Sequence, residues 1–229
     1  MSADPLVRGP ERARAVRDMF DRIAPRYRRT NRILTFGLDG RWRRRAVAAL
    51  GLAPGAVVLD IGCGPGELCG ELEAAGLRPV GVDVSEAMLR AGPRPGARVL
   101  ADGMGLPLAD RSVDGVTCGF VLRNVVDPAV LLGEMGRVLR RGGRLALLEV
   151  AEPTWQPARA AHRLYFHAVV PWMGGLLSDR RAYRYLPASS ILLPGPDALA
   201  AMAASAGLRS YRRRLIGLGA VQLVTAIRA

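Results

Sequence analysis

The sequence predicts one α/β domain, built on a doubly wound and mainly parallel sheet with helices on both faces. Short, continuously apolar runs alternate with helical stretches between residues 57 and 150, which is typical of parallel strands buried on both faces. A glycine-rich turn follows the first apolar run. The 229 residues also show no internal repeat and no low-complexity linker, so we treat the chain as a single domain.

The N-terminal segment, residues 1–50, is expected to be helical. Apolar side chains at offsets of three and four residues, with Arg on the opposite side, predict an amphipathic helix over residues 11–29. This stripe consists of Val16, Met19, Phe20, Ile23 and Tyr27. A turn and a second helix are expected to follow as far as residue 50, before Pro54 and Gly55 mark a boundary.

Five strands and three helices are expected in the central part of the chain. The strands fall at residues 57–60, 79–84, 97–101, 113–120 and 144–150, and the helices at 67–75, 86–91 and 128–140. Ser85 and Asp127 are placed to cap the second and third of these helices. Gly142 and Gly143 are expected to end the third.

The pattern of apolar residues is less regular in the C-terminal part, residues 151–229. Residues 151–194 predict helices that interrupt the sheet, and a further helix is expected at 197–206. Two terminal strands at 210–216 and 221–227 can pair antiparallel, which completes a mixed sheet of seven strands. Because crossovers between parallel strands are right-handed, the ligand crevice is expected at the carboxyl ends of the strands.

The positive charge is concentrated at the two ends of the chain. All 33 basic residues are Arg, and the formal net charge is +13. Residues 1–45 carry 13 Arg against 5 acids and residues 155–229 carry 10 against 2, whereas residues 46–154 carry 10 against 13. Such a charge favours a polyanion partner, either nucleic acid or an anionic membrane surface. A genomic bias toward Arg, with solvated faces, explains it equally well.

Several classes of protein are disfavoured by the sequence. The three cysteines, Cys63, Cys69 and Cys118, form no C-x-x-C pair, which argues against a disulfide scaffold and a structural zinc site and fits a reducing cytosol. Without an H-E-x-x-H motif or a carboxylate cluster, no metal is expected. The sequence has neither an apolar signal core nor a run near the roughly 18 apolar residues of a membrane-spanning helix, so we expect a cytoplasmic protein.

The most informative stretch is the glycine-rich turn at residues 57–67. A strand ending in Asp60 runs into Gly62, Gly64 and Gly66, which let the backbone fold tightly and approach a ligand without Cβ obstruction. Glu67 stands where a dinucleotide fingerprint needs Gly or Ala, and an acid there would repel a pyrophosphate. No G-K-[ST] sequence follows, so a P-loop is also excluded.

Three acids end three successive predicted strands. Asp60 precedes the turn, Asp83 can accept both ribose hydroxyls of an adenosine, and Asp102 can accept from an adenine amine. Together they suit an adenosine with a cationic tail, and S-adenosylmethionine is such a ligand because its sulfonium and ammonium disfavour a basic cradle. Taken singly, each Asp is better explained as a helix cap or turn former, and only the three together favour cofactor binding.

The chain resembles the class I S-adenosylmethionine-dependent methyltransferases, whose Rossmann-like fold has a mixed seven-stranded sheet. Within that class it is similar to the ubiquinone/menaquinone biosynthesis C-methyltransferases, from Val16 to Leu223. The resemblance is carried by residues 19–27 with Asn31, Gly37, Trp42 and Arg43, and by residues 119–125, 182–187 and 219–223.

This resemblance implies methyl transfer to the ring carbon of a demethylated, prenylated quinol, with demethylmenaquinol the usual bacterial substrate. The implied cofactor contacts are Asp60, Gly62, Gly64, Pro65, Gly66, Asp83, Asp102, Gly103 and Gly119. Some positions depart from the family pattern. Pro65 replaces a Thr and Gly119 a Ser, which removes two polar contacts, while Arg28 replaces an Asp, Val121 a Gly and Val224 a His.

Methyl transfer needs an aligned and electron-rich nucleophile, because the neutral thioether leaves without acid help. A quinol carbon becomes nucleophilic when a ring hydroxyl loses its proton. Arg123 follows the fourth strand and stays protonated, so it is expected to position the phenolate or a water, and Asn124 to orient the same hydroxyl. A salt bridge and a turn are their structural alternatives. His162 or His167 could act as base, although a structural role fits them better.

The aromatic residues of the two basic flanks suggest a pocket for a flat ring and an isoprenoid tail. Tyr27, Phe166, Tyr183 and Tyr185 are the candidate substrate-binding residues, with core packing as the alternative. The basic N-terminal helix can dock on anionic lipid. We therefore divide the domain into an N-terminal helical substrate cap (1–50), a cofactor-binding core (51–150), a helical substrate insertion (151–194) and a C-terminal helix with two strands (195–229).

Two other interpretations stay open at this point, and a third is disfavoured. The chain could methylate another phenolic or polyketide ring, or it could bind cofactor without catalysis, in view of Pro65 and Gly119. An RNA-modifying or RNA-binding protein is disfavoured, because the Arg clusters at 43–45 and 212–214 have only Trp42 and Tyr211 beside them as stacking platforms. No nucleic-acid partner is therefore expected, and a homodimer is compatible with the sequence.

Overall fold

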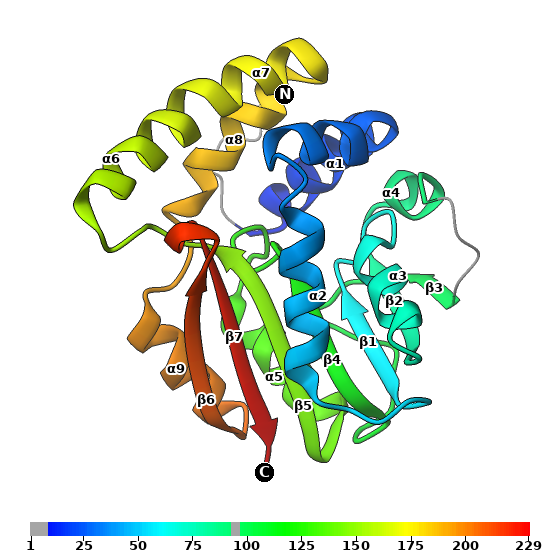
Figure 1. The fold of residues 1–229 in the computed structure, drawn as a ribbon. Coiled ribbons are helices and arrows are strands. Elements are labelled where there is room, and N and C mark those ends of the chain that lie inside the picture. The colour runs from blue at the N-terminus through cyan, green and yellow to red at the C-terminus, as the bar shows by residue number, and fades with distance from the viewer. Residues whose placement is uncertain (1–8, 93–96) are drawn as a thin grey trace.

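The computed structural model describes residues 9–92 and 97–229 and contains one seven-stranded sheet in the order β3-β2-β1-β4-β5-β7-β6 (Figure 1). Strands β1 to β5 pair in parallel, and β7 runs antiparallel to β5 and β6. The mixed, doubly wound sheet predicted from the sequence is therefore confirmed. Its strands are β1 Val57–Ile61, β2 Arg78–Asp83, β3 Ala97–Leu100, β4 Val113–Gly119, β5 Leu139–Val150, β6 Leu208–Ile216 and β7 Val221–Arg228.

Helices cover both faces of the sheet and its upper edge (Figure 1). In chain order they are α1 Gly9–Leu34, α2 Asp39–Leu50, α3 Glu67–Ala74, α4 Glu86–Arg90, α5 Pro128–Val138, α6 Gln156–Leu164, α7 Val170–Leu177, α8 Arg180–Ser190 and α9 Pro196–Ser205. A π-helical turn, η1 (Tyr165–Val169), joins α6 to α7, and a short 3-10 turn, η2 (Gly217–Gly219), precedes β7. The predicted caps are confirmed, since Ser85 accepts from the Met88 amide and Asp127 from those of Ala129 and Val130.

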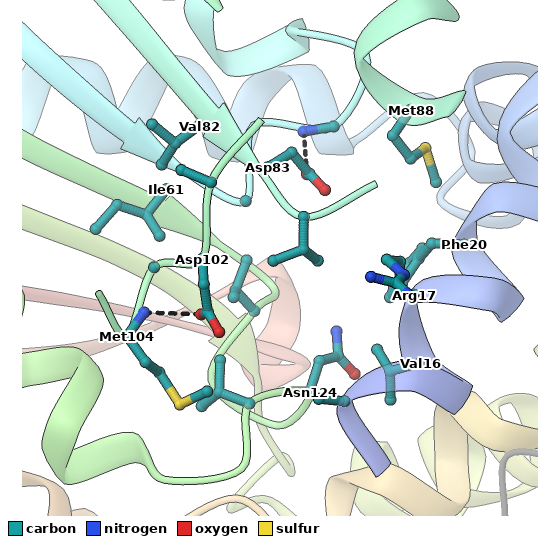
Figure 2. A pocket seen from close by; sticks show the side chains of 18 of the residues that line it. Val16, Arg17, Phe20, Ile61, Val82, Asp83, Met88, Asp102, Met104 and Asn124 are labelled. Carbon is teal, nitrogen blue, oxygen red and sulfur yellow. Dashed lines mark hydrogen bonds between the residues drawn. The ribbon is translucent and has the colours of Figure 1, made fainter. Parts of the chain in front are cut away.

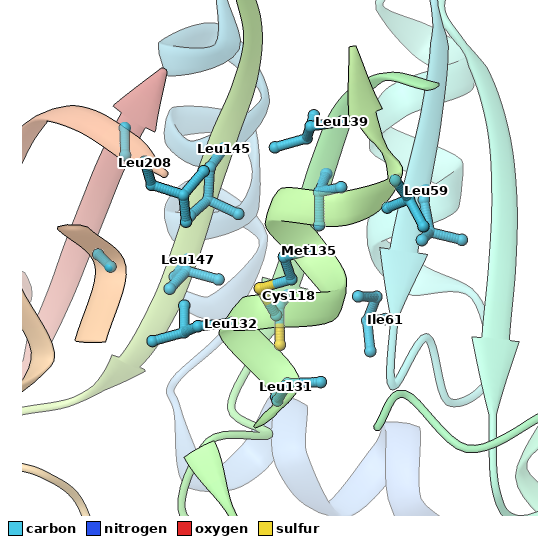
Figure 3. Packing of buried hydrophobic residues seen from close by; sticks show 14 of the residues in the cluster. Leu59, Ile61, Cys118, Leu131, Leu132, Met135, Leu139, Leu145, Leu147 and Leu208 are labelled. Atoms are coloured by element: carbon cyan, nitrogen blue, oxygen red, sulfur yellow. The ribbon is translucent and has the colours of Figure 1, made fainter. Parts of the chain in front are cut away.

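The core has one apolar layer on each face of the sheet. On one face α5 places Leu131, Leu132 and Met135, all fully buried, against Leu145 and Leu147 of β5 (Figure 3). On the other face α2 and α3 pack on β1, β5 and β7. Each such Leu or Met contributes about 1.5–3 kcal/mol through burial, so these layers hold the strand ends in a fixed arrangement.

A third apolar cluster lies above the carboxyl ends of the parallel strands. There α1 contributes Val16, Met19 and Ile23, and α8 contributes Tyr183 and Tyr185. Figure 1 shows α1, α7 and α8 together over this edge of the sheet. The apolar stripe of α1 is therefore used inside the molecule, and its exposed side carries Arg.

Two predicted boundaries were wrong. The helix expected through residue 140 ends at Val138, and Leu139 already pairs with Val113 as the start of β5. Gly142 and Gly143 lie instead in the irregular stretch before the parallel register resumes at Arg144, and Gly142 has a φ of +75°. The first helix is also longer than expected, because it continues to Leu34 through Pro25, which cannot donate a helical hydrogen bond.

Candidate active site

A cavity of about 380 Å³ opens at the carboxyl ends of the central strands (Figure 2). Val16, Arg17 and Phe20 of α1 form its outer wall. Its inner wall contains six of the nine residues proposed above for cofactor binding: Gly62, Gly64, Asp83, Asp102, Gly103 and Gly119.

Backbone amides orient the two carboxylates of this cavity. Asp83 accepts from the Gly64 amide and from the Ser85 amide, each at 2.8 Å, and Asp102 accepts from the Met104 amide at 2.9 Å. Figure 2 shows both side chains at the cavity. A carboxylate has about four acceptor positions, so each retains capacity for the hydroxyls or amine of a ligand. Burial raises the pKa of Asp83 above its usual value.

The glycine turn lies close to the next loop. Gly62 has a φ of +65°, and a Cβ at this position would stand 2.3 Å from Cγ2 of Val121. Any side chain would therefore collide with Val121 in addition to straining the backbone. The backbone of Gly62 and Gly64 borders the cavity directly, which is the kind of surface that a bound adenosine with a cationic tail needs beside Asp83 and Asp102.

Asp60, Pro65 and Gly66 do not line this cavity. The Asp60 side chain is buried beneath the turn, where it accepts from the Thr117 hydroxyl at 2.9 Å and the Cys69 thiol at 3.5 Å. Burial raises the pKa of Asp60 to about 7. Pro65 and Gly66 border a separate hollow on the outer side of the turn.

A second cavity, of about 190 Å³, adjoins the first. Phe20, Tyr27, Phe120 and Asn124 line both cavities. The second cavity is mainly apolar, and all four predicted substrate-wall residues line it: Tyr27, Phe166, Tyr183 and Tyr185. Three segments far apart in the sequence, α1, η1 and α8, therefore meet around one space.

A model of the ubiE/COQ5 methyltransferase family matches residues 9–228. The chain belongs to this family. It is an S-adenosylmethionine-dependent methyltransferase, as the turn and the strand-end acids predicted. Across residues 9–92 and 97–229, no three His, Cys, Asp or Glu side chains are grouped to hold a metal ion.

Relatives of the methyltransferase match it over most of both chains. A demethylmenaquinone methyltransferase from a Roseiflexus species is 43% identical, over 100% of this chain and 99% of its own. One from Thermus thermophilus is 45% identical, over 88% and 96%. The ubiquinone/menaquinone biosynthesis C-methyltransferase UbiE of Syntrophotalea carbinolica is 41% identical, over 93% and 94%.

Solved structures confirm the class I methyltransferase fold. A methyltransferase from Thermotoga maritima, described as a possible histamine N-methyltransferase, has a TM-score of 0.67 at 19% identity and covers 93% of this chain and 100% of its own. The geranyl diphosphate C-methyltransferase of Streptomyces coelicolor has a TM-score of 0.58 at 16% identity, over 84% and 80%.

Arg123 of the methyltransferase lines the second cavity and forms an ion pair with Glu149. Both side chains are buried, and the Arg123 Nε has no hydrogen-bond partner among the described residues. Asn124 lies where the two cavities meet. Its amide nitrogen donates to the Phe120 carbonyl at 3.1 Å, whereas its buried Oδ1 has no partner in the described part of the chain. Beside the junction, Arg123 and Asn124 therefore contribute one enclosed donor and one enclosed acceptor that have no partner among the described residues.

Sequence reasoning missed the polar cluster on the α1–α2 side of the second cavity. Arg43 donates to Asp39 at 2.7 Å and to Glu67 at 2.6 Å, and Asp39 and Arg43 both line the cavity. The i,i+4 spacing of Asp39 and Arg43 on a helix was the available signal. Burial, followed by the nearby charge of Glu67, raises the pKa of Tyr27.

The two histidines lie in different surroundings. His162 lines the second cavity and stacks on Phe166, with ring centroids 5.4 Å apart, and burial lowers its pKa. His167 is exposed and does not line that cavity.

Proposed function

We propose that this methyltransferase adds a methyl group to the ring carbon of a prenylated demethylquinol, with demethylmenaquinol as its substrate. The observation that carries the proposal is the meeting of two unlike cavities at Asn124, one bordered by carboxylates and glycines and one lined by aromatic rings. The relatives named as demethylmenaquinone methyltransferases support this choice of ring over another phenol.

In this proposal the first cavity holds S-adenosylmethionine, which supplies the electrophilic methyl group when bound. Asp83 accepts from the ribose hydroxyls and Asp102 from the adenine amine, and Gly62, Gly64, Gly103 and Gly119 allow close approach of the backbone. Asp60 acts from behind the turn, through Thr117 and Cys69, to hold its shape. Pro65 and Gly66 likewise shape the turn and make no contact inside the cavity.

The second cavity holds the quinol ring. Tyr27, Phe166, Tyr183 and Tyr185 sandwich the ring and the first part of the tail, which aligns one ring carbon toward the first cavity. Asn124 orients a ring hydroxyl, and the Arg123 guanidinium donates to the oxygen as that hydroxyl gives its proton to His162, which lines the same cavity. The ring carbon bonds to the methyl group as the bond between methyl and sulfur breaks, and the hydrogen on that carbon then leaves as a proton. Glu149 keeps the guanidinium of Arg123 in place. These roles make Arg123 and Asn124 the catalytic residues.

A comparison of substrates tests this proposal. Anaerobic assays should measure kcat/KM for reduced demethylmenaquinone, for the same ring without a tail, and for an unrelated phenol of similar size. The prenylated demethylquinol is expected to have the highest value, mainly through KM, because the tail adds apolar contact without changing the reacting atoms. Faster methylation of the unrelated phenol would reject the quinol assignment while leaving the methyltransferase assignment intact.

A further inference from the structure

The segment α6–η1–α7 forms one continuous helical rod across the top of the molecule (Figure 1). Along its outer side, Leu164, Ala168, Trp172 and Leu176 follow one another at intervals of four residues and are all exposed. Leu164 is 68% exposed, Trp172 69% and Leu176 77%. Exposed apolar side chains scattered singly are ordinary, but a continuous stripe of them marks a contact surface.

The π-helical turn keeps these residues on one side of the rod. An α-helix has about 3.6 residues per turn, so side chains spaced four residues apart move gradually around the helix axis. A π-helical turn contains more residues than an α-helical turn and therefore brings the next side chain back toward the same side. Pro171, just after η1, accounts for the π turn, because its ring would collide with the carbonyl four residues earlier in a regular α-helix.

The inner side of the same rod faces the substrate. His162, Tyr165, Phe166 and Val170 line the second cavity. One layer of helix therefore separates the proposed quinol site from the exposed stripe. On the inner side α7 packs tightly on α8, where a Cβ on Gly174 would stand 2.1 Å from the Tyr183 ring.

Cationic side chains lie on α8, the helix that packs against α7. Arg180, Arg181 and Arg184 are exposed on α8, which packs beside α7, and none of them forms an ion pair with any residue in the ranges 9–92 and 97–229. An exposed apolar stripe with a Trp, together with unpaired Arg on the neighbouring helix, matches the interface of an anionic lipid bilayer in both polarity and charge. None of the helices in the described ranges is both long and apolar enough to cross a bilayer.

We propose that the outer face of α6–η1–α7, which we call the docking stripe (Leu164, Ala168, Trp172 and Leu176), lies on an anionic lipid bilayer. The inference rests on the proposed function, because a prenylated quinol is dissolved in the bilayer and must enter a cavity just behind this rod. It changes the expectation for the N-terminal helix, since the apolar side of α1 is buried and its exposed side presents mainly Arg, together with Glu11 and Asp18.

Vesicle binding tests this proposal with the full-length protein. On vesicles of phosphatidylcholine and phosphatidylglycerol, the Trp172→Glu/Leu176→Glu variant is expected to lose at least tenfold in partition coefficient. The control Val130→Glu replaces a 46% exposed apolar residue on α5, far from the stripe, and is expected to bind normally. Replacing Arg180, Arg181 and Arg184 by Gln should weaken binding about fivefold per residue on these vesicles and leave binding to pure phosphatidylcholine unchanged.

Two further measurements distinguish a lipid bilayer from a second copy of the protein as the partner of this face. In a Trp42→Phe/Trp155→Phe background, Trp172 is the single Trp of the chain, and brominated lipid chains should quench its fluorescence. Sedimentation without lipid should show the same oligomeric state for the wild-type protein and the Trp172→Glu/Leu176→Glu variant. Unchanged vesicle binding by that variant would overturn the proposal, and so would conversion of a dimer to monomers, because the stripe would then be a dimer interface. Failure of the quinol assay with intact lipid binding would count against the proposed substrate and not against the docking stripe.

Discussion

Arg123 and Glu149 form an ion pair in which the side chains are only 6% and 2% exposed. The amide of Val150 also donates to the Glu149 carboxylate, at 2.8 Å. The carbonyl of Arg123 in turn accepts from the Arg12 guanidinium of α1 at 2.6 Å. The loop after β4 is thereby fixed to β5 and to the helical layer above it, with Asn124 held at the junction of the two cavities.

Removal of Arg123 is expected to slow methyl transfer and to spare cofactor binding. Arg123→Ala would leave Glu149 buried without a partner, which costs about 3–5 kcal/mol of folding stability. Arg123→Met/Glu149→Gln removes both charges and is expected to fold nearly normally. In that variant kcat should fall about 100-fold, because a donor to the developing oxyanion is lost. The affinity for S-adenosylmethionine, measured by calorimetry, should be unchanged. Loss of that affinity would show that Arg123 serves the cofactor site and not the quinol oxygen.

The carboxylate of Asp83 is expected to decide cofactor affinity. Asp83→Ala removes the acceptor for two ribose hydroxyls, which corresponds to about 3 kcal/mol, or a factor of more than 100 in Kd. Asp18→Asn, an exposed acid on α1, is the matched control and should bind normally. Titration calorimetry with S-adenosylmethionine measures both. Equal affinities would refute the assignment of the first cavity to the cofactor.

Gly62 and Val121 are expected to interact in a double-mutant cycle. Gly62→Ala places a Cβ 2.3 Å from Val121 Cγ2 at a positive φ, so we expect a loss of about 1–3 kcal/mol in the free energy of unfolding, together with weaker cofactor binding. Adding Val121→Gly removes the collision and should restore part of the stability, leaving only the backbone strain. Urea unfolding measures each variant, and strictly additive effects would mean that the two residues do not touch.

The buried Asp60 predicts a pH dependence of stability. Burial raises its pKa from 3.8 to about 7 in the folded protein, so the native state binds the proton more tightly than the unfolded chain does. The free energy of unfolding should therefore fall as pH rises from about 4 to about 7. Asp60→Asn, which stays neutral, should reduce this slope. Urea unfolding at pH 5 and pH 8 without cofactor tests this, and parallel curves for the two proteins would contradict it.

The sequence alone was sufficient for the strands, the glycine turn and two helix caps, because these depend on residues close together in the chain. The boundary between α5 and β5 was wrong because the pairing of Leu139 with Val113 is a long-range contact that local helix propensity does not report. Polarity at a strand end also could not show that Asp60 points beneath the turn while Asp83 borders the cavity.

Only part of the site could be predicted, because some of its contacts join residues that are far apart in the sequence. The family motif located Arg123, and the aromatic content of the two flanks indicated the four aromatic residues, but the ion pair of Arg123 joins residues 26 positions apart and has no local signature. The Arg residues of the basic flanks, which first suggested a polyanion partner, include both paired and unpaired side chains in the structure. Arg43 is paired with Asp39 and Glu67, whereas Arg180, Arg181 and Arg184 of α8 form no ion pair with the described residues.

Transfer of an isotopic label tests the central claim most directly. The purified protein should be incubated anaerobically with S-adenosylmethionine labelled in its methyl group and with chemically reduced demethylmenaquinone. We predict labelled menaquinol with the label on the ring carbon, and a rate reduced about 100-fold by Arg123→Met/Glu149→Gln. An unlabelled quinol, with S-adenosylmethionine binding intact, would contradict the account.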